Sequence, residues 1–167
     1  MSAMACYRQL RSESTMGHMK PAFFTIALAI VPLCLNCYGQ RSYATVEKRV
    51  SVLIGKMLNS STEQQAFADL EALGCPAVPA IIEQMDDRRK LPDPNISLKN
   101  QLPAFEAMRH YGPQEVVDAL AAILNQITGQ HFGFIYNGGT DAEREKTVRG
   151  WRHFLHKTPA TNLCVGG

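Results

Sequence analysis

Residues 67–82 read FADLEALGCPAVPAII, and this stretch predicts two helices joined by a very short turn. Gly74 is expected to end the first helix, because glycine readily adopts the left-handed conformation found at helix C-termini. Pro76 suits the first turn of the second helix, where a backbone N–H has no helical partner to lose. Apolar residues then recur at the i, i+3, i+4 and i+7 positions of one helical face: Val78, Ile81, Ile82 and Met85.

Apolar residues at helical spacing predict further helices on both sides of this pair. Their expected ranges are Thr45–Leu58, Pro103–His110, Pro113–Gly129 and Thr140–His156. We expect Ser60 or Ser61 to cap the helix that ends at Gly74, with Glu63 or Gln64 completing a capping box.

The segments between these helices are expected to be irregular. Residues 91–102 are rich in proline, which forbids a continuous helix there. Only residues 132–136 suggest a short extended piece, and residues 158–167 are expected to form a loose tail. Thr140 or Asp141 is expected to cap the last helix. The predicted fold class is therefore all-α.

A second helix–Gly–Pro–helix unit follows the first. Residues 103–120 repeat the plan with PAFEAM, then YGP at 111–113, then VVDAL. Gly112 takes the place of Gly74, and their offset is close to the period of roughly 40 residues found in HEAT and armadillo arrays.

This plan resembles the HEAT-repeat family, an armadillo-like α-solenoid family, in its bacterial exported type. The most similar part is ADLEALG at 68–74 with AVPAII at 77–82, and the resemblance covers Thr62–Gly129. It departs at the proline-rich break, which is longer than a family linker. The resemblance implies a short solenoid of antiparallel helix pairs over residues 45–157, closed by a C-terminal capping helix in which Trp151 covers the apolar end.

Residues 1–39 have the pattern of a signal peptide, with basic residues before an apolar run at 22–35. That run is shorter than the roughly 20 residues needed to span a bilayer. Small residues suit cleavage after Gly39 or after Ala44. Further alternatives stay open: a start at Met16 or Met19, lipidation at Cys34 or Cys37, and an uncleaved membrane anchor. We expect a periplasmic or secreted protein that meets the membrane only through its leader or a lipid anchor.

Removal of the leader leaves Cys75 and Cys164 as the remaining cysteines. In an oxidising compartment these two can pair, which would tie the tail to the first helix pair. The alternative is that Cys75 is a small buried residue and Cys164 lies unpaired in the tail.

Basic residues supply the predicted partner-binding surface, since arginine is favoured at interface hot spots. They are Arg88, Arg89, Lys90, Arg149 and Arg152. The alternative is that these side chains only solvate helix ends. The formal net charge of +2 is too small to predict nucleic-acid binding.

No motif predicts a catalytic residue, a metal or a cofactor. His153 and His156 stand three residues apart but lack an obvious third ligand. The NGGT stretch at 137–140 lacks the lysine and the preceding strand of a P-loop. The carboxylates that lie close together are expected at solvated helix ends: Asp86, Asp87, Asp141, Glu143 and Glu145.

The sequence therefore favours a non-enzymatic module that binds a protein partner through a helical face. Two alternatives are kept: an envelope immunity or inhibitor protein that binds one toxin or hydrolase, and an enzyme of unknown type.

Overall fold

The computed structural model describes residues 43–99 and 108–164. The predicted leader, residues 1–39, lies outside these described residues, as do residues 103–107 of the predicted fourth helix. Within the described ranges, no helix is both long enough and apolar enough to cross a bilayer.

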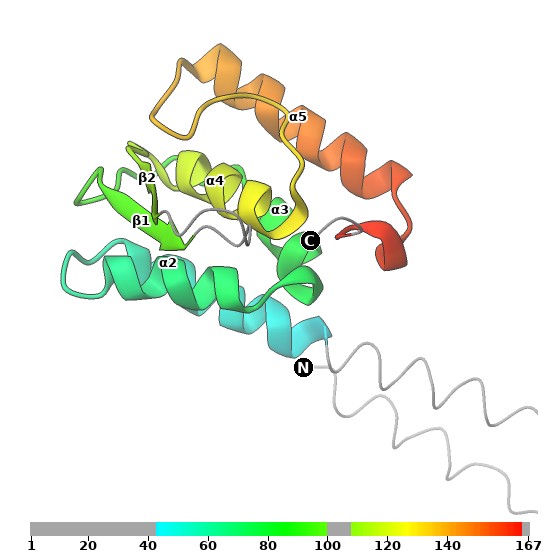
Figure 1. Cartoon of the computed structure of the whole chain (residues 1–167), viewed down its shortest axis with the longest axis horizontal. Helices are drawn as coiled ribbons and strands as arrows, with labels where there is room; N and C mark the ends of the chain where they lie inside the picture. Colours follow the sequence, from blue (N-terminus) through cyan, green and yellow to red (C-terminus); the bar gives the residue numbers. More distant parts are fainter. Residues whose placement is uncertain (1–42, 100–107, 165–167) are drawn as a thin grey trace, which may run out of the picture. The chain divides into compact units, whose positions relative to one another are not determined.

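Helices make up most of the described chain, and a small antiparallel sheet accompanies them (Figure 1). Residues 43–57 are helical. The other elements are α2 (Glu63–Ala72), η1 (Cys75–Ala77), α3 (Val78–Glu83), β1 (Ile96–Lys99), β2 (Met108–Tyr111), α4 (Val116–Thr128), α5 (Asp141–Lys157) and η2 (Ala160–Asn162). The all-α prediction is thus right for the bulk of the described chain and misses its sheet.

The predicted helix pair at 67–82 is confirmed. α2 ends just before Gly74, whose φ of 61° lies in the left-handed region, and η1 with Pro76 leads directly into α3. The predicted Ser60 or Ser61 cap is wrong, because α2 begins at Glu63 and its N-cap is Thr62. The residues before α2 instead form hydrogen bonds to residues that precede them in the chain. The Ser61 hydroxyl and N–H donate to the Asn59 side chain, and the Thr62 hydroxyl donates to the Lys56 carbonyl at 2.7 Å.

The predicted helix at 103–110 is wrong over its described end, because Met108–Tyr111 form strand β2. This strand pairs with β1, which lies in the proline-rich break, in an antiparallel register that places Ile96 opposite Tyr111. The sequence ISLK of β1 alternates apolar and polar residues, so Ile96 and Leu98 both face the core, each 1% exposed. Gly112 therefore follows a strand, and the second helix–Gly–Pro–helix unit is not formed as predicted.

The outer edge of β1 is closed by a side chain of α2. The Gln64 amide donates to the Ser97 carbonyl at 2.7 Å and accepts from the Ser97 N–H at 3.1 Å. Both backbone groups of Ser97 are thereby satisfied without a third strand, so the strand edge is blocked at this residue.

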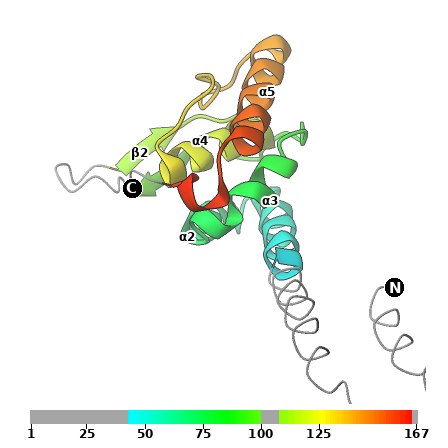
Figure 2. The same cartoon turned by 90° about the vertical axis from the view of Figure 1, so that its right-hand side faces the viewer.

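Helix α4 lies at the centre of the described helices, between α2 and α5 (Figure 2). Every residue from Val116 to Leu124 is buried, as expected for a helix that is covered on all sides. Gly129 ends α4 in the left-handed conformation, as predicted. Pro113 does not open the helix, because Glu115 is the N-cap and forms a capping box with Asp118.

Helix α5 begins with the predicted Thr140 cap, whose hydroxyl accepts from the Glu143 N–H at 3.3 Å.

Phe132 crosses helix α5 directly over Gly150, where a Cβ would come within 2.5 Å of the Phe132 side chain. That close approach lets Phe132 meet Trp151 edge-to-face at 4.8 Å, and Trp151 is fully buried.

The predicted loose tail is wrong for residues 158–164. Leu163 is 3% exposed, and Cys164 forms a disulfide with Cys75 across 89 residues of sequence. The red C-terminal segment accordingly runs from the end of α5 to the turn between α2 and α3 in both views (Figures 1 and 2). Of the two alternatives for Cys75 and Cys164, the structure therefore shows the disulfide rather than two unpaired cysteines.

Candidate functional site

The predicted basic residues follow α3 or lie on α5, and carboxylates accompany most of them. Arg149 pairs with Glu145 at 3.6 Å, one turn away on α5. The other ion pairs join Arg88 to Glu115 and Asp141, Arg89 to Asp87, and Arg152 to Asp86. Asp86, which follows α3, pairs with Arg152 on α5. The basic residues that follow α3 therefore lie near those of α5. Lys90 is exposed, and its backbone bridges to Glu115. The partner surface predicted from these residues is therefore largely neutralised within the chain.

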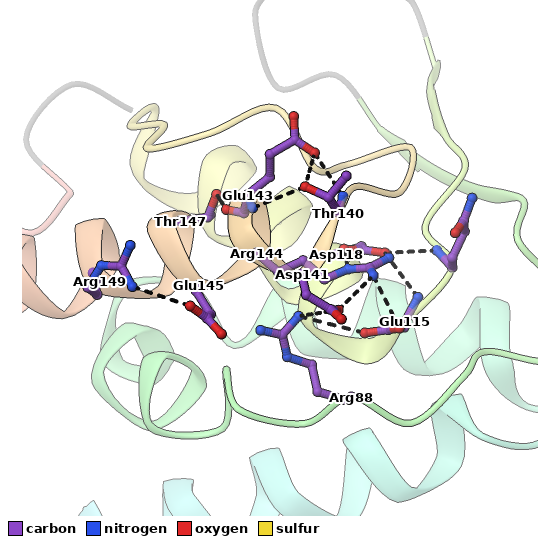
Figure 3. Close-up of polar contacts among 11 residues, drawn as sticks. Arg88, Glu115, Asp118, Thr140, Asp141, Glu143, Arg144, Glu145, Thr147 and Arg149 are labelled. Atoms are coloured by element: carbon purple, nitrogen blue, oxygen red, sulfur yellow. Dashed lines mark hydrogen bonds and ion pairs between the residues drawn. The ribbon is translucent and has the colours of Figure 1, made fainter.

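A buried ion pair joins α4 to α5 (Figure 3). Arg144, 5% exposed, donates from Nε and Nη2 to the two carboxylate oxygens of Asp118, each at 2.8 Å. Asp118 is fully buried and also accepts the N–H groups of Gln114 at 3.1 Å and Glu115 at 3.0 Å. These four hydrogen bonds use both oxygens of the carboxylate, which stabilises its charge.

Further charges surround this pair. Arg144 Nη1 lies 3.2 Å from Glu115 and 3.7 Å from Asp141, and Arg88 lies 3.8 Å from Glu115. The hydrogen bond to Asp118 raises the pKa of Arg144 above its usual value. Asp118 Oδ1 accepts from Arg144 Nε, whereas Oδ2 accepts from Arg144 Nη2 and from the N–H groups of Gln114 and Glu115. The arrangement fixes α5 against α4, and we assign it a structural role.

A second buried carboxylate, Glu63, opens α2. It is 3% exposed, its Oε2 accepts the Asp93 N–H at 3.0 Å, and its Oε1 is buried without a hydrogen-bond partner. Burial raises the pKa of Glu63 above 4.5 and the charge of Asp93 adds to this, whereas the hydrogen bond from Asp93 opposes it. The folded state therefore binds a proton at Glu63 more tightly than the unfolded chain does.

Glu63→Gln is expected to make stability less dependent on pH. Because the pKa of Glu63 is higher in the folded state, the wild type loses stability as pH rises from about 4.5 through the folded-state value. The glutamine keeps an acceptor for the Asp93 N–H and carries no charge to desolvate. Urea unfolding at pH 4.5 and pH 8 should show that the stability of the variant relative to the wild type is greater at the higher pH. Equal pH slopes for the two proteins would contradict this account of Glu63.

A basic hollow lies on the other side of the chain, between the helix at 43–57 and α2. It has a volume of about 390 Å³ and opens to solvent. Its lining residues are Thr45, Lys48, Arg49, Val52, Leu53, Lys56 and Asp69. Leu53 is buried at its floor, whereas Val52 is 50% exposed among exposed basic side chains. We refer to these seven residues as the basic hollow.

The basic hollow differs from the predicted basic surface in its balance of charge. It holds Lys48, Arg49 and Lys56 against one carboxylate, Asp69, which accepts a hydrogen bond from Gln65 on the same helix at 2.7 Å. The helix at 43–57 was predicted from its buried apolar stripe alone, so the basic residues beside that stripe were not predicted as a binding surface. Its signal was the basic residues at positions 48, 49 and 56, which flank the buried stripe that includes Leu53.

The remaining predicted candidates serve the fold or face solvent. His153 and His156 are exposed, and residues 43–99 and 108–164 contain no group of three His, Cys, Asp or Glu side chains suited to a metal. In the 137–140 stretch, Asn137 accepts the Gly112 N–H at 2.7 Å. Glu143 accepts the Thr140 N–H at 2.8 Å, so its carboxylate occupies the place at the start of α5 where an anion would bind.

No protein-family model matches this sequence, and searches of curated proteins and of solved structures gave no significant match.

Proposed function

We propose that the chain is a non-enzymatic interaction module of the cell envelope or secreted space that binds a protein partner at the basic hollow. The observation that carries the proposal is the exposed Val52 among three basic side chains in an open depression. An apolar anchor surrounded by polar residues is the usual anatomy of a protein-binding surface.

The ion pairs described above favour the basic hollow over the predicted residues. Arg88, Arg89, Arg149 and Arg152 each lie beside a carboxylate of the same chain, so a partner's acidic group would compete with an existing contact. Lys48, Arg49 and Lys56 together have only Asp69 beside them within the basic hollow. Charge complementarity with an acidic partner is therefore greater there.

The Cys75–Cys164 disulfide supports the exported location, since such bonds persist in oxidising compartments. We further propose that the resemblance to HEAT repeats is limited to the α2–α3 pair, where the helix–Gly–Pro–helix plan is formed. A solenoid would require that pair to stack with its neighbours, and the helix at 43–57 is the neighbour available on the side of α2.

Site-specific crosslinking tests the proposal. With a photoreactive amino acid in place of Val52, we expect an envelope extract to yield one crosslinked protein. Mass spectrometry should identify it, and it should bind the purified chain in a 1:1 complex. The same amino acid in place of Lys146, exposed on α5, serves as the control. A partner that crosslinks equally at both positions, or that fails to bind after purification, would contradict the proposed site.

A further inference from the structure

The basic hollow presents a regular pattern along one face of the helix at 43–57. Lys48, Val52 and Lys56 follow one another at intervals of four residues, so they form a single ridge. With a rise of about 1.5 Å per residue, the two lysine Cα atoms are about 12 Å apart with the valine midway. A basic–apolar–basic ridge of this length equals slightly more than two helical turns.

Asp69 restricts what can lie against this ridge. It belongs to α2 and lines the basic hollow opposite the lysines. A uniform polyanion or a flat anionic membrane would bring negative charge to Asp69 as well as to the lysines. A ligand with discrete charges can instead place carboxylates at Lys48 and Lys56 and leave Asp69 without a like charge beside it.

We infer that the basic hollow receives an amphipathic helix of the partner that carries two carboxylates seven or eight residues apart with an apolar residue between them. This inference rests on the proposed function and specifies its partner. The two carboxylates pair with Lys48 and Lys56, and the apolar side chain covers Val52 above Leu53. Arg49 lies beside the ridge and adds attraction for a further acidic residue on that helix.

Helix-stabilised synthetic peptides test the inference. One peptide carries Glu-x-x-x-Leu-x-x-x-Glu, and a second has the same composition with one glutamate moved to the opposite face. Calorimetry with the purified chain should show the patterned peptide binding at least about 10-fold more tightly than the permuted one, the scale of one well-placed charge contact. Equal affinities would overturn the inference.

Charge reversal provides the second arm. The variant K48E/K56E should bind the patterned peptide about 10-fold or more weakly than the wild type does. It should also bind a peptide in which both glutamates are replaced by lysines. K146E, which reverses an exposed charge on α5, should bind the original peptide as the wild type does. The absence of a gain with the lysine peptide would overturn the inference. So would stronger binding to phosphatidylglycerol vesicles than to the patterned peptide, because that result would assign the ridge to a membrane.

The crosslinked partner separates this inference from the proposed function. If K48E/K56E loses that partner but the partner contains no such helix, the inference fails and the proposed function stands. If K48E/K56E binds the partner as tightly as the wild type, the proposed function itself fails.

Discussion

The double variant C75S/C164S is expected to be less stable than the wild type by about 4 to 5 kcal/mol. The disulfide closes a loop of 89 residues, and the chain-entropy model assigns about this much to a loop of that length. Guanidinium unfolding under non-oxidising conditions would measure the difference, with the m-value fitted separately for each protein because the disulfide restricts the unfolded chain.

Chemical reduction supplies the matched control for this variant. Wild-type protein unfolded in the presence of a dithiol reductant should have the same midpoint as C75S/C164S. Partial proteolysis should also cut the reduced chain near η2, because Leu163 would no longer be held in the core by its neighbour Cys164. A loss of less than about 1 kcal/mol on reduction would show that the tail is held by packing alone.

Arg144→Met is expected to cost about 3 to 5 kcal/mol, since removal of one partner leaves the Asp118 carboxylate buried and without its main counter-charge. Adding Asp118→Asn to this variant should restore part of the loss, because the uncompensated charge is then gone. The four proteins form a double-mutant cycle, and urea unfolding of each gives the coupling energy between Asp118 and Arg144.

Arg149→Met is the matched control on the same helix. Arg149 is exposed and pairs with Glu145 at 3.6 Å, so the same substitution should cost less than about 0.5 kcal/mol there. If Arg144→Met were as mild as Arg149→Met, the buried pair would not hold α5 against α4.

Local signals in the sequence predicted most of the helices correctly. Gly74 and Gly129 end helices through their own backbone freedom, and Thr140 caps α5 through a side chain three residues from its partner. Such interactions involve only near neighbours. The spacing of apolar residues likewise identified the buried stripes of α2, α3 and α4, because burial follows helical periodicity.

The sheet could not be predicted because its stabilising contacts are distant in sequence. Each strand has four residues, which is too short for alternation to exceed the helical signal around it. β1 forms because β2 pairs with one edge, Gln64 bonds the other, and Ile96 and Leu98 reach the core. None of these partners can be identified from the residues of β1 alone.

The binding residues predicted from the sequence differ from those of the basic hollow, although both sets are basic. Basic side chains were expected to carry it, but the carboxylates beside Arg88 and Arg152 come from Glu115, Asp141 and Asp86, which are brought close by folding. No role was predicted for Asp118, because its partner Arg144 lies 26 residues further along the chain. In both cases, tertiary contacts decide which charges surround a residue.

The affinity of the crosslinked partner for charge-reversed variants tests the central claim most directly. Binding of that partner to K48E/R49E/K56E should be weaker by about 10- to 100-fold than binding to the wild type, because like charges would then face each other across the interface. K146E/R149E/R152E, which reverses as many charges on α5, should bind within about threefold of the wild type. If K146E/R149E/R152E lost affinity and K48E/R49E/K56E did not, the result would contradict this account. It would indicate that the partner binds at the arginines of α5 instead.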